Sequence, residues 1–140
     1  MVPPRGVDAT AAIRTAEITG AVSRVAANSG VRAEMRARQQ QWAVERGGGV
    51  IEGRDIGSVV FPDAELKLYL TASPRVRAER RVAEAGGDVD EIERALAARD
   101  HYDSTRDDSP LTEAAGSTLV DTTGRSIEEV LQHIVRLLEH

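Results

Sequence analysis

The sequence predicts an α/β fold in which helices cover both faces of a parallel sheet. Short apolar segments alternate along its 140 residues with longer segments whose apolar residues recur at helical spacing. Several of the longer segments begin with residue types that commonly cap a helix. Parallel strands need long crossover connections, which are usually helices, so this alternation indicates a parallel sheet.

The first third of the chain, residues 8–45, is predicted to be mostly helical. The pair Ser29-Gly30 indicates a break, after which a second helix covers residues 31–46. Three consecutive glycines, residues 47–49, are expected to end that helix. The apolar residues that carry the first helical pattern are Ile13, Ile18, Val22 and Val25.

Three short apolar segments are predicted to be strands, at about residues 50–52, 66–70 and 118–121. The first is expected to be buried and to run straight into the sequence GRDIG. In the second, leucines alternate with Lys67 and Tyr69, which is the period of a strand with two different faces.

Three further helices are predicted from capping residues. Ser73 directly precedes Pro74, the pairing of an N-cap with a first helical position. Asp88 is followed three residues later by an acidic residue and begins the next helix. Ser126 and Glu129 have the spacing of a capping box, and an apolar stripe follows them.

Composition excludes several classes of protein. The chain has no cysteine, which excludes disulfides, zinc ribbons and thiol catalysis and fits a reducing cytoplasm. No run of about 18 apolar residues is present to span a membrane. The first residues, MVPPRG, lack the apolar region of a signal peptide, so a cytoplasmic location is expected. The three histidines are scattered, so no metal site in the protein is expected.

The basic residues are almost all arginine: of 18, 17 are arginine and one, Lys67, is lysine. One interpretation is the codon bias of a GC-rich genome. The other is that some arginines bind phosphate, because the planar guanidinium matches the geometry of its oxygens. With a net charge of −5, the chain lacks the basic surface that nucleic-acid polymers require. A small anionic ligand fits this balance better.

Two charged clusters are candidates for a site. Arg54 and Asp55 follow the first predicted strand, and ligands of parallel sheets bind at the carboxyl ends of strands. The alternative there is a turn with a surface ion pair. Residues 101–116 predict a polar surface loop. The charged cluster of residues 99–108 is either a solvated loop with balanced charges or a mobile lid that carries arginines. Arginines of such a lid would stabilise charge on a transferring phosphoryl group.

Four segments, residues 13–32, 52–73, 98–111 and 120–130, together resemble the bacterial-type cytidylate kinases. The resemblance extends from Val7 to the end of the chain. Its most specific part is GRDIGSVVFPDA, because this stretch separates the family from adenylate and thymidylate kinases. The resemblance implies transfer of the γ-phosphoryl group of ATP to CMP or dCMP, giving CDP or dCDP.

The resemblance implies roles for residues outside the lid. Ser23, Arg32 and Asp55 would read the cytosine, and Arg54 would hold the phosphate of the acceptor. An arginine and an aspartate together match the carbonyl and amino edge of cytosine, whereas the imide of uracil mismatches them. A buried polar group left unpaired costs about 1–3 kcal/mol, which provides discrimination.

In the lid, the resemblance implies that Asp103 binds the sugar hydroxyls. Arg99 and Arg106 would be the catalytic arginines, which contact the sugar, the acceptor phosphate and the transferring group. The resemblance implies that Mg²⁺ would be held largely by ATP and by segments of the family's proteins that this sequence does not contain.

The resemblance also implies one incomplete domain: part of the three-layer sheet of the P-loop nucleoside monophosphate kinases, with helices on both faces and a small lid. Residues 1–30 would be the end of the acceptor-binding lobe. Residues 31–98 and 114–140 would form the core, and residues 99–113 the lid.

The sequence departs from the family at the P-loop, G-x-x-x-x-G-K-[ST], which holds the phosphates of ATP. Its one lysine, Lys67, has no glycine-rich loop before it. The alternative to a kinase is a non-catalytic nucleotide-binding fragment, or a subunit that needs a separate P-loop chain. In the family the P-loop strand lies within the sheet, so self-association or a complementing amino-terminal fragment is expected. No membrane partner is expected.

Overall fold

The computed structural model describes residue 8 and residues 12–139, and these form two compact units, Met1–Gly49 and Val50–His140. Among the described residues, no helix is long and apolar enough to cross a membrane. The elements in chain order are η2 (Ala12–Arg14), α1 (Ala16–Ala26), α2 (Ser29–Arg46), η3 (Ile56–Val60), β1 (Leu68–Thr71), α3 (Pro74–Ala85), α4 (Val89–Thr105), β2 (Thr118–Asp121) and α5 (Ile127–Leu138).

The first unit is helical, as predicted, but the break between its helices lies earlier than Ser29-Gly30. Asn28 is the N-cap of α2, with an extended backbone and a side-chain oxygen that accepts a hydrogen bond from Val31 N at 3.1 Å. This cap places both residues of the predicted break inside the first helical turn. Gly47 ends α2 in the left-handed conformation, at φ 67°, which confirms the predicted end.

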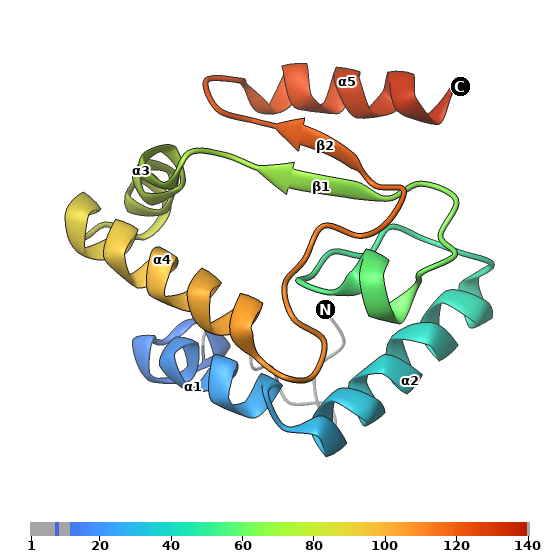
Figure 1. The fold of residues 1–140 in the computed structure, drawn as a ribbon. Helices are drawn as coiled ribbons and strands as arrows, with labels where there is room; N and C mark the ends of the chain where they lie inside the picture. The colour runs from blue at the N-terminus through green and yellow to red at the C-terminus, as the bar shows by residue number, and fades with distance from the viewer. Residues whose placement is uncertain (1–7, 9–11, 140) are drawn as a thin grey trace. The chain divides into compact units, whose positions relative to one another are not determined.

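The second unit contains the sheet, in which β1 and β2 pair in parallel (Figure 1). Leu68 pairs with Thr118, and Thr71 pairs with Asp121. After β2 the chain turns, and α5 runs back in the opposite direction (Figure 1). The prediction of an α/β fold with a parallel sheet is therefore confirmed.

The prediction of a buried strand at residues 50–52 is wrong. No strand is assigned there, and Val50 is 99% exposed. A strand requires a neighbour that takes up its backbone hydrogen bonds, and the sheet of the described residues has two strands, β1 and β2. Two adjacent apolar residues followed by a glutamate do not reveal whether such a neighbour exists.

The capping residues predicted for the three later helices are all confirmed. Ser73 accepts a hydrogen bond from Val76 N at 3.3 Å, and Asp88 accepts one from Glu91 N at 2.9 Å. At the start of α5, Ser126 forms a reciprocal capping box with the carboxylate three residues on.

Helix α4 extends further than the sequence indicates. The predicted loop at residues 101–116 begins with five helical residues, because α4 ends at Thr105. The hydroxyls of Ser104 and Thr105 donate to the carbonyl of His101, at 3.0 and 2.8 Å, and so remain compatible with helical backbone. The extension matters because it places Asp103 on a helix.

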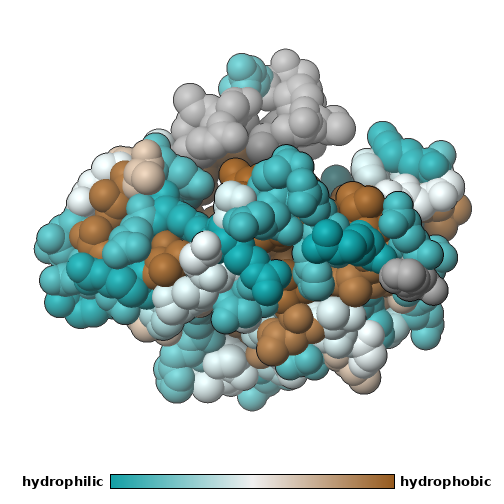
Figure 2. All heavy atoms as spheres, turned by 90° about the horizontal axis from the view of Figure 1, so that it is seen from above, coloured by the Kyte–Doolittle hydropathy of each residue, from teal (hydrophilic) through white to brown (hydrophobic). Residues whose placement is uncertain are grey.

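Large apolar side chains are exposed on the second unit. Leu70 in β1 and Leu119 in β2 are 57% and 56% exposed. Ile127 and Leu138, at the two ends of α5, are exposed as well. Figure 2 shows apolar residues at the surface among the polar ones.

Candidate functional site

A tight backbone turn presents the first residues of the site. Gly53, Arg54 and Asp55 lead into η3, a single π-helical turn in which Phe61 N donates to Ile56 O at 2.7 Å. A Cβ atom on Gly53 would lie 2.8 Å from Cγ1 of Ile56, so glycine allows this close approach. π-Helical turns are rare and occur frequently at functional sites.

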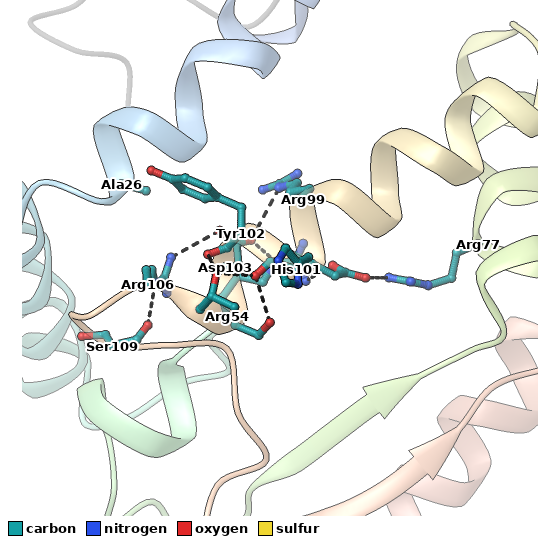
Figure 3. Close-up of polar contacts among 12 residues, drawn as sticks. Ala26, Arg54, Arg77, Arg99, His101, Tyr102, Asp103, Arg106 and Ser109 are labelled. Carbon is teal, nitrogen blue, oxygen red and sulfur yellow. Dashed lines mark hydrogen bonds and ion pairs between the residues drawn. The ribbon is translucent and has the colours of Figure 1, made fainter.

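The carboxylate of Asp103 is the centre of the site. It lies in α4, is 2% exposed, and contacts three arginines that point toward it (Figure 3). Arg54 Nε lies 3.2 Å and Arg99 Nε 3.7 Å from Oδ2, and Arg106 Nη1 lies 3.4 Å from Oδ1. Helical spacing brings Arg99 to this carboxylate, whereas Arg54 comes from a segment about fifty residues away in the sequence.

The chain after α4 folds back to hold Arg106. The Arg106 side chain is 6% exposed, and its Nε donates to Ser109 O at 2.6 Å. Leu111 N donates to the carbonyl of Asp103 at 2.8 Å. Ser109 is buried and has a φ of 54°, which costs a non-glycine residue about 1 kcal/mol. Strain of this kind is common in segments that hold functional side chains.

A second carboxylate, Asp100, lies one helical turn before Asp103. Its Oδ1 is 2.7 Å from Arg54 Nη1, and its Oδ2 is 2.6 Å from Arg77 Nη1. The first contact is an ion pair without hydrogen-bond geometry. Burial raises the pKa of Asp100, but the contacts with Arg77 and Arg54 outweigh burial and bring this pKa below its usual value. Asp100 therefore remains a carboxylate at neutral pH.

The cluster formed by Arg54, Arg77, Arg99, Arg106, Asp100 and Asp103 has four positive and two negative charges. Two of its buried N–H nitrogens, Arg77 Nε and Arg106 Nη2, have no hydrogen-bond partner. A surplus of guanidinium charge with unused donors suits a phosphate or another small oxyanion. In the described part of the chain, no group of three or more acidic or histidine side chains is placed to hold a metal.

The structure brings four of the seven residues singled out from the sequence into this cluster: Arg54, Arg99, Asp103 and Arg106. Asp55 adjoins it in the chain, and its carbonyl accepts from Val59 N at 2.9 Å.

The other two residues, Ser23 and Arg32, belong to the first unit. Ser23 lies within α1, but its side chain is outside the described part of the structure. Arg32 Nη1 donates to Ala26 O at 3.1 Å, which joins the start of α2 to the end of α1.

Sequence reasoning missed the roles of Asp100 and Arg77. The spacing of Asp100 and Asp103 would have placed both carboxylates on one helix face, had residues 101–105 been predicted as helix. No local signal distinguishes Arg77 from the other arginines of α3, because its partner lies on α4.

The chain is similar to known proteins along most of its length. A family model described as cytidylate kinase matches residues 3–140. The chain is 47% identical over 139 residues to a cytidylate kinase of Mycobacterium leprae (strain Br4923), covering 96% of this chain and 62% of that protein. It is 47% identical over 135 residues to one of Listeria welshimeri, covering 93% of this chain and 60% of that protein.

A relative with a longer chain is also similar. The bifunctional pantoate ligase/cytidylate kinase of Synechococcus sp. (strain RCC307) is 49% identical over 138 residues, covering 94% of this chain and 27% of that protein. The chain thus spans about three fifths of the cytidylate kinases named above and about a quarter of the bifunctional protein.

Proposed function

The chain belongs to the cytidylate kinase family, and on this premise we propose that it serves phosphoryl transfer from ATP to CMP or dCMP. The observation that carries the proposal is the buried carboxylate of Asp103 with Arg54, Arg99 and Arg106 around it. Arginines in fixed positions supply the charge that a transferring phosphoryl group requires.

The proposed reaction is a single displacement. An oxygen of the acceptor phosphate attacks the γ-phosphorus of ATP, the bond from that phosphorus to the bridging oxygen breaks, and ADP leaves with CDP or dCDP as the other product. Arg54 holds the acceptor phosphate. Arg99 and Arg106 contact the transferring group, and an arginine in this position typically contributes about a thousandfold in rate. Asp103 accepts hydrogen bonds from the sugar hydroxyls.

Base recognition in this proposal belongs to Ser23, Arg32 and Asp55. We also propose a division of the chain into three parts. Residues 1–30 form the end of an acceptor-binding lobe, residues 31–98 and 114–140 form a three-layer core, and residues 99–113 form a lid. A cytoplasmic location belongs to the same proposal. In this proposal Mg²⁺ would be held largely by ATP and by segments of the family's proteins that this sequence does not contain, and it would neutralise phosphate charge.

A second candidate is a nucleotide-binding subunit that depends on a separate P-loop segment. One observation favours it: the lysine of this sequence is already engaged. Lys67 Nζ donates to Pro62 O at 2.8 Å and to Ala115 O at 2.5 Å, which ties two loops together. A lysine held in this way does not serve ATP phosphates.

We therefore expect turnover near background from the 140 residues alone. Robust turnover of CMP that Arg106→Ala abolishes would contradict this.

Nucleotide titrations of the purified chain test the function. We expect CMP to bind more tightly than UMP or AMP, and Arg54→Ala to weaken CMP binding at least tenfold, about the loss of one charge-assisted hydrogen bond. Arg125→Ala, an exposed arginine outside the cluster, is the matched control and should leave CMP affinity unchanged. Equal affinity for all three nucleotides would show that this chain does not read cytosine.

A further inference from the structure

Two carboxylates on one helix hold the same guanidinium. Arg54 Nη1 lies 2.7 Å from Asp100, and Arg54 Nε lies 3.2 Å from Asp103. Both carboxylates belong to α4, three residues apart, and both side chains are more than three-quarters buried. Arg54 thus forms ion pairs at two of its nitrogens with a single helix, without hydrogen-bond geometry at either carboxylate oxygen.

The two carboxylates differ in their other partners. Asp103 is shared with Arg99 and Arg106, the arginines of the site. Asp100 is instead shared with Arg77 of α3, whose Nη1 lies 2.6 Å from Oδ2 of Asp100. Asp100 is therefore anchored to a second helix, α3. No residue that we assign to substrate binding lies on α3.

We propose that Asp100 is a positioning residue for Arg54: anchored by Arg77, it keeps the Arg54 guanidinium directed at the anionic group of the substrate. The inference rests on the proposed function, in which Asp103 binds the sugar. Once Asp103 accepts hydrogen bonds from the sugar, its contact with Arg54 weakens, and Asp100 is the carboxylate that still holds that side chain. A guanidinium that is already held loses less rotamer freedom when it binds phosphate.

Simple electrostatics predicts the opposite effect of removing Asp100. The cluster has a net charge of +2, from four arginines and two aspartates. Asp100→Asn would make it more positive and would strengthen the attraction of a phosphate. Positioning predicts weaker binding, because without Asp100 neither carboxylate of the pair keeps Arg54 directed at the phosphate once Asp103 binds the sugar. The sign of the change separates the two explanations.

The experiment measures how much of the affinity depends on the phosphate. Kd values for CMP and for cytidine are obtained by calorimetry on the 140-residue chain, and inorganic phosphate is titrated separately. We expect Asp100→Asn to lower the ratio of cytidine Kd to CMP Kd about tenfold, with the cytidine Kd itself unchanged. Binding of inorganic phosphate should weaken as well, but by a smaller factor, because no sugar draws Asp103 away from Arg54. Asp100→Glu, which retains the carboxylate, should restore part of the ratio.

Asp90→Asn is the matched control. Asp90 pairs with Arg75, so it also links α4 to α3, but both side chains are about half exposed or more. Removing this ion pair should change neither the Kd ratio nor the phosphate Kd. Arg77→Gln should lower the ratio in the same direction as Asp100→Asn, because Arg77 acts through Asp100.

Several results would overturn the inference: tighter phosphate binding by Asp100→Asn, equal losses for cytidine and CMP, or an equal effect of Asp90→Asn. A wild-type chain without phosphate-dependent affinity would overturn it too, because Arg54 would then not be an anion ligand. If the wild-type chain binds inorganic phosphate but shows no preference for CMP over UMP, the proposed function fails, while the phosphate titrations still decide the role of Asp100.

Discussion

At the scale of single residues, Asp103 balances more charge than any other described side chain of the cluster. Three arginines contact a carboxylate that is almost completely buried. Removing one partner of a buried ion pair costs about 3–5 kcal/mol, because the opposite charge is left without compensation. We expect Asp103→Asn to lower the free energy of unfolding by about 3 kcal/mol in denaturant titrations. Asp107→Asn, at an exposed position, should change it by less than about 0.5 kcal/mol.

Asp55 is expected to act on the base rather than on fold stability. In a chain joined to a P-loop segment, Asp55→Ala should raise the KM for CMP far more than the KM for ATP, because it removes an acceptor for the amino group of cytosine. Steady-state kinetics with each nucleotide varied in turn would measure this. Equal effects on the two KM values would instead make Asp55 a structural residue.

The Asp100 carboxylate gives fold stability a predictable pH dependence. Its folded-state pKa is below that of an unfolded aspartate, about 3.9, so the folded state binds fewer protons between these two values. Its contribution is therefore complete above the unfolded pKa and is lost as the pH falls through the folded one. We expect a Tm difference between wild type and Asp100→Asn at pH 7 that shrinks below about pH 4. A difference that grows in acid would have the wrong sign.

At the scale of elements, the capping box at the start of α5 provides a sharp test. Ser126 Oγ accepts from Glu129 N at 3.2 Å, and Glu129 Oε2 accepts from Ser126 N at 2.8 Å. Ser126→Ala removes the hydroxyl acceptor and should cost about 1 kcal/mol in the free energy of unfolding. Ser126→Asp keeps an acceptor at the N-cap and should cost much less. Equal losses for both variants would mean that the side-chain cap contributes nothing.

The Glu129 carboxylate of this box also has a pKa lowered by its hydrogen bonds from Ser126, first from the backbone N–H and then from the hydroxyl. The capping box therefore stabilises α5 fully at pH values above the usual glutamate pKa. This stabilisation is lost as the pH falls through the lowered pKa of Glu129. This matters for α5 because many of its apolar side chains are exposed and contribute little burial to its stability.

At the scale of the whole molecule, the exposed apolar residues predict association or low stability. Leu70 and Leu119 lie on the two strands of the sheet, and Val50 lies just before the GRD turn. Exposed apolar surface on this scale favours self-association. We expect sedimentation to show oligomers, or thermal melting to show a marginal transition. A monomer with a cooperative transition well above about 60 °C, hotter than most mesophile domains, would contradict this.

The sequence by itself determined the features that depend on neighbours in the chain. Ser73, Asp88 and Ser126 were predictable as caps because an N-cap bonds to backbone two or three residues away. The parallel pairing followed from the order of strand and helix patterns, and β1 and β2 bear it out. Arg54, Arg99 and Arg106 were singled out by the resemblance to a known family, which does not depend on what their side chains contact.

Only the tertiary structure decided the features that depend on residues distant in the sequence. Residues 50–52 have strand composition but no strand, because pairing requires a neighbour that composition does not reveal. Helix α4 continues through a polar stretch that ends in a fold-back held by Arg106 and Ser109. The pairing of Arg77 with Asp100 joins two helices. The local sequence pattern shows which side chains are present. Packing between segments distant in the sequence determines which side chains contact each other and how deeply they are buried.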